Sequence, residues 1–121
     1  GMAPLVSQAV RLGLMKPQSI KQLECFEAAL TFARTEGIII APETRHAVAS
    51  AIREANKAKE EGKEKVIVFN LSGHGLVDLK GYDMFMRGEL TDFELPMAGI
   101  EKNLEAIRAF PKPEPLSTAK K

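Results

Sequence analysis

The clearest pattern in this chain is the change from a continuous apolar run to small, polar and flexible residues. Residues 65–71 read Lys-Val-Ile-Val-Phe-Asn-Leu, and residues 72–75 read Ser-Gly-His-Gly. A run that is apolar at successive positions, rather than alternating, is typical of a β-strand buried on both faces of a parallel sheet. Ligands of open α/β sheets bind beyond the carboxyl ends of such strands. The pattern therefore predicts a strand at 65–71 and a ligand site at 72–75.

Apolar positions spaced three and four residues apart predict helices over most of the remaining chain. We expect about five helices, beginning near residues 3, 19, 42, 78 and 96. The second is predicted to open with a capping box from Ser19 to Gln22 and to end near Gly37. Pro42 suits the first turn of the third helix, and Asp78 is expected to cap the fourth.

The β-branched run at residues 38–40 predicts a short strand before the third helix. Strand, helix and strand in this order make one right-handed βαβ unit. The expected fold class is α/β: a three-layer helix–sheet–helix fragment with a short parallel sheet. A strand apolar throughout needs neighbours on both sides, and two strands are too few. We therefore expect the chain to be part of a larger sheet, or a module that associates with itself or a partner.

Length and composition bound the organisation of the chain. Its 121 residues suit one domain, and we assign 1–110 to a single α/β domain and the proline-containing segment 111–121 to a disordered tail. Basic and acidic residues are interleaved at a net charge of +1, which argues against nucleic-acid binding. Cys25 is the single cysteine, so an internal disulfide is excluded and a cytoplasmic setting is expected. No apolar run approaches the ~20 residues of a membrane span, and no signal-peptide pattern opens the chain.

Ser72 and His74 do not form a hydrolase motif. A nucleophile elbow requires glycine two residues before and two residues after the serine, and here these positions are Asn70 and His74. Gly73 and Gly75 allow two interpretations: they cradle a small anionic ligand, or they simply turn the chain after a buried strand. Both interpretations stay open on the sequence.

The remaining polar candidates give weaker signals. Cys25, His46 and His74 match no metal-ligand spacing, so no metal site is expected, and Cys25 is expected to be a small core residue. Glu36 falls at a helix end, where the helix dipole disfavours negative charge. It is either a solvated helix terminus or an acid held there for a function.

Three segments together resemble the tryptophan synthase beta-chain family, and most of all its second, stand-alone branch. They are residues 24–29 (Glu-Cys-Phe-Glu-Ala-Ala), 32–38 (Phe-Ala-Arg-Thr-Glu-Gly-Ile) and 68–75 (Val-Phe-Asn-Leu-Ser-Gly-His-Gly). The resemblance runs in register from the first residue to about Gly88. It implies the C-terminal part of a pyridoxal phosphate enzyme of fold type II, a lyase that makes L-tryptophan from indole and L-serine in amino-acid biosynthesis.

The resemblance also implies roles for four residues. Ser72 matches the family serine whose hydroxyl contacts the pyridine nitrogen of the cofactor, and Glu36 matches the family glutamate beside it. Gly73 and Gly75 would let the backbone pass close to the ring. Ile40 departs from the family, which usually has proline at this position.

The family's Schiff-base lysine and its phosphate-binding loop lie upstream, and no lysine of this chain stands in the family's lysine motif. We therefore expect no catalytic residue here, no covalent retention of pyridoxal phosphate and no activity of this chain alone. The expected partner is the missing N-terminal half or a second copy of the chain. The alternative is a non-catalytic binding or oligomerisation module derived from the family.

Overall fold

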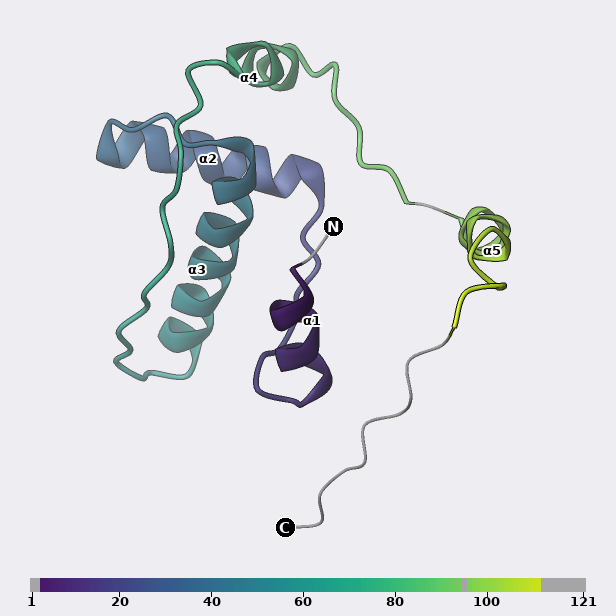
Figure 1. Cartoon of the computed structure of the whole chain (residues 1–121). Coiled ribbons are helices and arrows are strands. Elements are labelled where there is room, and N and C mark those ends of the chain that lie inside the picture. Colours follow the sequence, from purple (N-terminus) through teal and green to yellow (C-terminus); the bar gives the residue numbers. More distant parts are fainter. Residues whose placement is uncertain (1–2, 95, 112–121) are drawn as a thin grey trace.

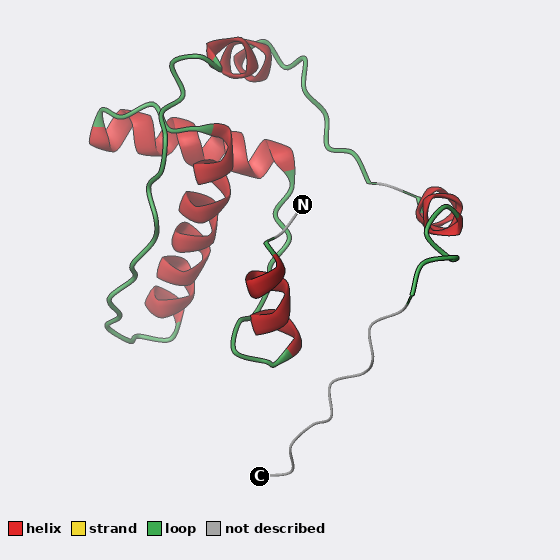
Figure 2. Cartoon of the chain, viewed as in Figure 1, coloured by secondary structure: helices red, strands yellow, loops and turns green. Residues whose placement is uncertain are grey.

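The computed structural model describes residues 3–94 and 96–111, and the regular secondary structure of this part is entirely helical. Figure 2 shows helices joined by loops, with no strand in the described residues. The helices are α1 (Pro4–Arg11), α2 (Gln22–Glu36), α3 (Pro42–Glu60), α4 (Leu79–Met86) and α5 (Met97–Glu105). The expected tail at 111–121 lies, apart from Pro111, outside the described residues.

The predicted parallel sheet is wrong. Residues 38–41 and 63–77 are loops, and the second runs back along α3 toward α4 (Figure 1). The two segments meet near one point, where the Gly75 amide donates to the Ile39 carbonyl at 2.9 Å. A β-ladder needs a neighbouring backbone along its whole length, and no other described segment lies there to supply one. The predicted α/β class with a βαβ unit is therefore replaced by an all-helical arrangement.

The exposure of the 65–71 segment explains this failure. Val66 is 93% exposed and Val68 is 88% exposed, whereas Ile67 between them is half-buried. One face of the segment lies toward the helices and the other faces solvent. The sequence is that of a strand covered on both faces, but the described chain covers only one.

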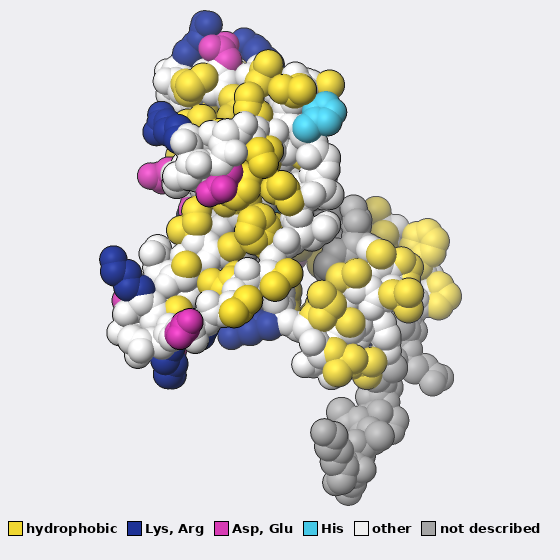
Figure 3. Space-filling view, turned by 90° about the vertical axis from the view of Figure 1, so that its left-hand side faces the viewer, with side chains coloured by type: hydrophobic (Ala, Val, Ile, Leu, Met, Phe, Trp, Pro, Cys, Tyr) yellow, Lys and Arg dark blue, Asp and Glu magenta, His cyan; other side chains and the backbone are white. Residues whose placement is uncertain are grey.

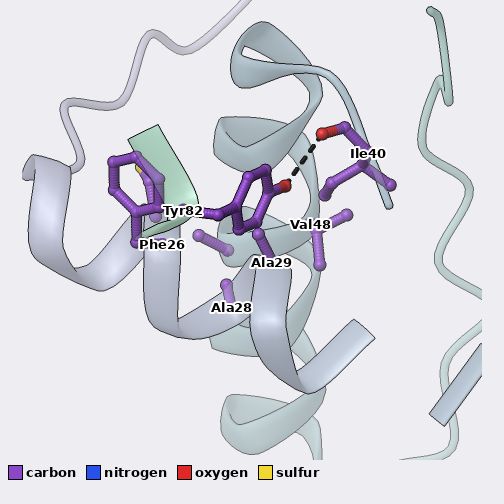
Figure 4. Packing of buried hydrophobic residues seen from close by; sticks show 8 residues of the cluster. Phe26, Ala28, Ala29, Ile40, Val48 and Tyr82 are labelled. Carbon is purple, nitrogen blue, oxygen red and sulfur yellow. Dashed lines mark hydrogen bonds between the residues drawn. The ribbon is translucent and has the colours of Figure 1, made fainter. Parts of the chain in front are cut away.

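The core lies where α2 crosses α3 and α4 packs against α2 (Figure 1). Its buried residues are Cys25, Phe26, Ala28, Ala29, Ile40, Val48, Ala49 and Tyr82. The Phe26 ring meets Tyr82 edge-on at 5.5 Å between centroids and stacks on Phe85 at 5.2 Å. The Arg45 guanidinium lies 3.6 Å from the centre of the Phe26 ring, a cation–π contact. Figure 4 shows Phe26 and Tyr82 over the alanines of α2.

Small side chains bring α2 and α3 close together. Ala29 is completely buried, and Ala28 and Ala49 are nearly so. Alanine lets two helix backbones approach closely without loss of side-chain entropy. The crossing of α2 and α3 is therefore the closely packed centre of the described structure.

The helix ends show which local signals held. Gly37 ends α2 with a left-handed φ of 71°, and Pro42 opens α3, both as predicted. The predicted capping box is wrong, because α2 begins at Gln22 and the preceding Lys21 makes no side-chain cap. The Asp92 carboxylate, 69 residues away along the chain, instead accepts the free amide of this first turn. A distant residue therefore replaces the local cap.

The outer helices bury little of their apolar faces. No residue of α1 or α5 is buried, and Leu104 of α5 is 47% exposed. Figure 1 shows α5 lying apart from α2, α3 and α4. Within the described residues, no helix is long and apolar enough to cross a membrane.

A buried tyrosine links α4 to the turn before α3. The Tyr82 hydroxyl donates to the Ile40 carbonyl at 2.8 Å, and both residues belong to the core (Figure 4). Burial raises the pKa of Tyr82 above its ordinary value, and the nearby Arg45 opposes this rise. The neutral phenol is therefore the form that the fold favours.

This pKa shift predicts a loss of stability at alkaline pH. The contribution of Tyr82 to the free energy of unfolding is expected to be constant below about pH 10, the ordinary tyrosine pKa. It should fall as the pH rises from there through the raised pKa, because the unfolded chain ionises first. Tyr82 is the only tyrosine, so its ultraviolet absorbance titration reports this pKa directly.

The matched variant is Tyr82→Phe, which keeps the ring and removes the hydroxyl. It should lose the tyrosine-dependent fall at alkaline pH and cost about 1–3 kcal/mol at neutral pH, because the Ile40 carbonyl is left unpaired. Urea unfolding of both forms at several pH values measures this. An absorbance titration with a pKa at or below the ordinary value would contradict the prediction.

Candidate functional site

The loop at residues 72–75 is held against the first turn of α3. The Thr44 hydroxyl donates to the Ser72 carbonyl at 2.6 Å, and the Gly75 amide donates to the Ile39 carbonyl at 2.9 Å. Thr44 is buried, with 3% of its surface exposed. The loop predicted to be a ligand site therefore has a defined backbone position, fixed from two sides.

The two glycines are required by this close approach. A Cβ on Gly75 would lie 2.4 Å from the Ile40 carbonyl oxygen and 2.8 Å from Cγ2 of Ile39. Gly73 has a φ of +69°, which favours glycine, and a Cβ there would lie 3.1 Å from that of Ala41. Of the two interpretations left open by the sequence, the structure supports the tight turn. The approach of these glycines to a cofactor ring stays a prediction.

Ser72 is an exposed residue whose backbone carbonyl is held by a hydrogen bond. Its carbonyl accepts the Thr44 hydrogen bond, while the residue as a whole is exposed. A serine hydroxyl can donate a hydrogen bond to a ring nitrogen. The contact of Ser72 with a cofactor ring stays a prediction.

Glu36 is exposed as the last residue of α2. In the described part of the chain no hydrogen bond or ion pair joins it to residues 72–75. The link between the two places is indirect, because Ile39, three residues after Glu36, accepts the Gly75 amide. The role of Glu36 beside the cofactor stays a prediction.

Ile40, where the sequence resemblance leads us to expect proline, has a clear structural role. Its side chain is completely buried in the core, and its carbonyl accepts the Tyr82 hydroxyl. Ile40 therefore fills apolar space at the turn before α3. The turn itself still leads into Pro42 and the helix.

The histidines and the cysteine do not form a site with Ser72. Cys25 is buried, as predicted, and its sulfur lies 3.2 Å from Nδ1 of His46. Burial raises the pKa of the Cys25 thiol, and nearby Arg45 opposes this, so the neutral thiol is favoured. Nδ1 of His74 accepts a bond from the Leu76 amide in its own loop. Among the described residues no three His, Cys, Asp or Glu side chains are grouped as for a metal ion.

Thr44 and Tyr82 are the site residues that the sequence analysis missed. Both hold the backbone around the loop, Thr44 at Ser72 and Tyr82 at Ile40. A signal was present for Thr44: it lies four residues before Val48, on the buried stripe of α3. A lone hydroxyl on an apolar stripe indicates a buried hydrogen bond.

An apolar hollow of about 280 Å³ lies between α2, α3 and the 65–71 segment. It is lined by Thr31, Phe32, Thr35, Val48, Ala51, Ile52, Ala55, Ile67 and Phe69. The Phe32 and Phe69 rings meet edge-on across it, 6.1 Å apart. Figure 3 shows apolar side chains gathered on the face along which this segment runs. The lining of the hollow is apolar apart from the two threonines and carries no charged side chain.

Comparison with known proteins identifies the family. No family model matches the chain. Curated relatives match at 58% identity over 94 residues (tryptophan synthase beta chain of Thermococcus onnurineus) and at 60% over 92 residues (tryptophan synthase beta chain 2 of Aquifex aeolicus). Another, tryptophan synthase beta chain 2 of Thermotoga maritima, is 62% identical over 82 residues.

These matches cover 78%, 76% and 68% of this chain, but only 21%, 21% and 19% of the respective relatives. The chain thus spans about a fifth of their length, which fits a C-terminal fragment, and it is homologous to part of a biosynthetic enzyme subunit. It belongs to the tryptophan synthase beta-chain family, and the resemblance seen in its sequence is confirmed. The matches include type 2 beta chains, the branch that the motifs indicated.

Proposed function

We propose that this chain forms the C-terminal wall of a pyridoxal phosphate site in a tryptophan synthase beta-like lyase of fold type II. The observation that carries the proposal is the exposed Ser72 on a loop whose backbone is fixed by Thr44 and Gly75. The names of the relatives support the reaction class, the formation of L-tryptophan from indole and L-serine. The cytoplasmic setting expected from the single cysteine is part of this proposal.

Ser72 supplies a neutral donor in this proposal. Its hydroxyl would hydrogen-bond the pyridine nitrogen, and a neutral hydroxyl does not force that nitrogen to be protonated. Pyridoxal phosphate, when bound, supplies an electron sink for carbanion chemistry. A hydroxyl partner moderates that sink, which favours replacement at the β-carbon over transamination.

The lysine that holds the cofactor and the loop that binds its phosphate are proposed to come from the part of the family's chain outside these 121 residues. The exposed outer face of the 65–71 segment supports this arrangement, because Val66 and Val68 are almost fully exposed. In the whole enzyme this face would be covered by further strands. The alternative expectation is that a second copy of the chain packs against the same face.

The first prediction from this proposal concerns the isolated chain. With pyridoxal phosphate, indole and L-serine it is expected to form no tryptophan and no stable visible absorbance band of a lysine-bound cofactor. Absorbance spectroscopy and a tryptophan assay measure both. Turnover by the isolated chain would contradict the assignment of the covalent chemistry to another part of the protein.

A chimera provides the complementary experiment, in which activity is expected. The segment of the Thermotoga maritima beta chain that matches this chain would be replaced by the corresponding residues from here. The chimera is expected to make tryptophan, and Ser72→Ala is expected to slow it about five- to tenfold, the effect of losing one hydrogen bond. The matched control is Ser50→Ala, since Ser50 bonds Gln18 away from the loop.

A folded chimera without activity would favour the alternative, a binding or oligomerisation module derived from the family. Equal rates for the Ser72→Ala and Ser50→Ala chimeras would remove Ser72 from the site. The two outcomes are distinct, because the first concerns the whole segment and the second concerns one side chain.

A further inference from the structure

We propose that Thr44 is the positioning residue for Ser72: its buried hydroxyl sets the backbone of the 72–75 loop and thereby the direction of the Ser72 side chain. This inference rests on the proposed function, because Ser72 is the cofactor contact in it. Thr44 itself touches no reacting group and acts only through Ser72.

The geometry of the hydrogen bond carries the first step. The distance from Oγ1 of Thr44 to the Ser72 carbonyl oxygen is 2.6 Å, at the short end for a hydroxyl donor. Thr44 is the one polar residue among the buried residues of the described chain. Breaking this hydrogen bond would leave the buried Thr44 hydroxyl without a partner, which costs free energy. The bond between Thr44 and Ser72 is therefore favoured over an open arrangement of the loop.

The place of Thr44 in its helix carries the second step. It is the third residue of α3, directly after Pro42 and Glu43. A threonine near a helix start often caps its own helix, but the cap residue here is Ala41, which makes no side-chain bond. The Thr44 hydroxyl is directed instead to a loop 28 residues further along the chain.

Two other contacts limit how the loop can move when Thr44 holds it. The Gly75 amide is bonded to Ile39, and the Tyr82 hydroxyl holds the Ile40 carbonyl beside it. Thr44 therefore fixes the Ser72 end of the loop, and Ile39 fixes the Gly75 end. With both ends held, Ser72 has a fixed Cα–Cβ direction and only its side-chain rotation remains free.

As a consequence, the position of Ser72 in the proposed site is preorganised. The contacts that place Ser72 come from α3, α4 and the turn between α2 and α3, and all of these lie within the described residues. A donor that is already in place loses less entropy when a ligand binds. The Ser72 side of the proposed site therefore rests on contacts made within this chain.

The test compares the full chain with Thr44→Val, which keeps the volume and removes the hydroxyl, and with Thr44→Ser, which keeps the hydroxyl. Amide hydrogen exchange followed by NMR reports the loop through the Gly75 amide and the core through the Ala29 amide. We expect Gly75 to exchange about five- to tenfold faster in Thr44→Val, the effect of one lost hydrogen bond, with Ala29 much less affected. Thr44→Ser should restore the protection of Gly75.

Equal exchange at Gly75 in wild type and Thr44→Val would overturn the inference. If Thr44→Val fails to fold, Thr44→Ser decides: a loosened loop in this folded variant overturns the inference, and a protected one supports it. Pyridoxine 5′-phosphate, which has no aldehyde to react with lysines, is then added to the chimera carrying each form, because the phosphate-binding loop is proposed to lie outside these 121 residues. A shift of the Ser72 amide in the unsubstituted chimera that weakens with Thr44→Val supports both the positioning role of Thr44 and the cofactor role of Ser72. No shift in any chimera contradicts the cofactor role of Ser72, while the exchange data still test the positioning role of Thr44.

Discussion

Phe26→Ala is expected to lower the free energy of unfolding by about 3–5 kcal/mol, the usual cost of removing a buried aromatic ring. Phe26 is 4% exposed and lies at the meeting point of α2, α3 and α4. Its loss removes the stacking on Phe85, the edge contact with Tyr82 and the platform under Arg45. A domain with ordinary stability of about 5–15 kcal/mol would lose a large fraction of it.

Urea unfolding followed by circular dichroism measures this effect. The matched control is Phe93→Ala, the same chemical change at a residue that is 80% exposed, and it should cost less than about 0.5 kcal/mol. Phe26→Leu should fall between the two, because it refills part of the cavity. If Phe26→Ala and Phe93→Ala unfold at the same urea concentration, the described core is not the stabilising centre of this chain.

Gly75→Ala is expected to have the largest effect on the candidate site. The new methyl group would lie 2.4 Å from the Ile40 carbonyl oxygen, so the loop must move away from the turn before α3. Overpacking of this kind typically costs about 1–3 kcal/mol. The movement would also lengthen the hydrogen bond from Gly75 to Ile39 and release the Ser72 end of the loop.

The measurement is again urea unfolding, with loop exchange as a second readout. Gly13→Ala is the control: Gly13 has a φ of +72° and nothing within 4 Å of an added Cβ, so only backbone strain of about 1–2 kcal/mol is expected. The two variants therefore separate a close approach from a strained backbone. Faster loop exchange in Gly13→Ala than in Gly75→Ala would contradict the assignment of the contact to the site.

The sequence predicted a candidate site but not the contacts that hold it. The change of pattern at 72–75 predicted a ligand site in this loop, and the family resemblance predicted Ser72 as the contact; both stay predictions. The reason for Gly75 was not visible, because Ile39 and Ile40 lie 35 or more residues earlier and only the folded chain brings them together. Thr44 was missed for the same reason, since its acceptor is 28 residues away.

The sequence by itself determined the elements whose hydrogen bonds are local. The end of α2 at Gly37 and the start of α3 at Pro42 follow from the backbone preferences of single residues. The backbone hydrogen bonds of a helix join residues only four positions apart. Family membership also followed from the sequence, because it is a property of the motifs and not of their packing.

Only the tertiary structure decided whether residues 38–40 and 65–71 form a sheet. A strand is stable only when another backbone lies beside it. In the described chain the nearest backbone hydrogen bond joins Ile39 to Gly75, which lies beyond the 65–71 segment. The apolar pattern at 65–71 is that of a strand, yet Val66 and Val68 face solvent. The cap of α2 by Asp92 and the tether of Ser72 by Thr44 were decided in the same way, by partners that are distant in sequence.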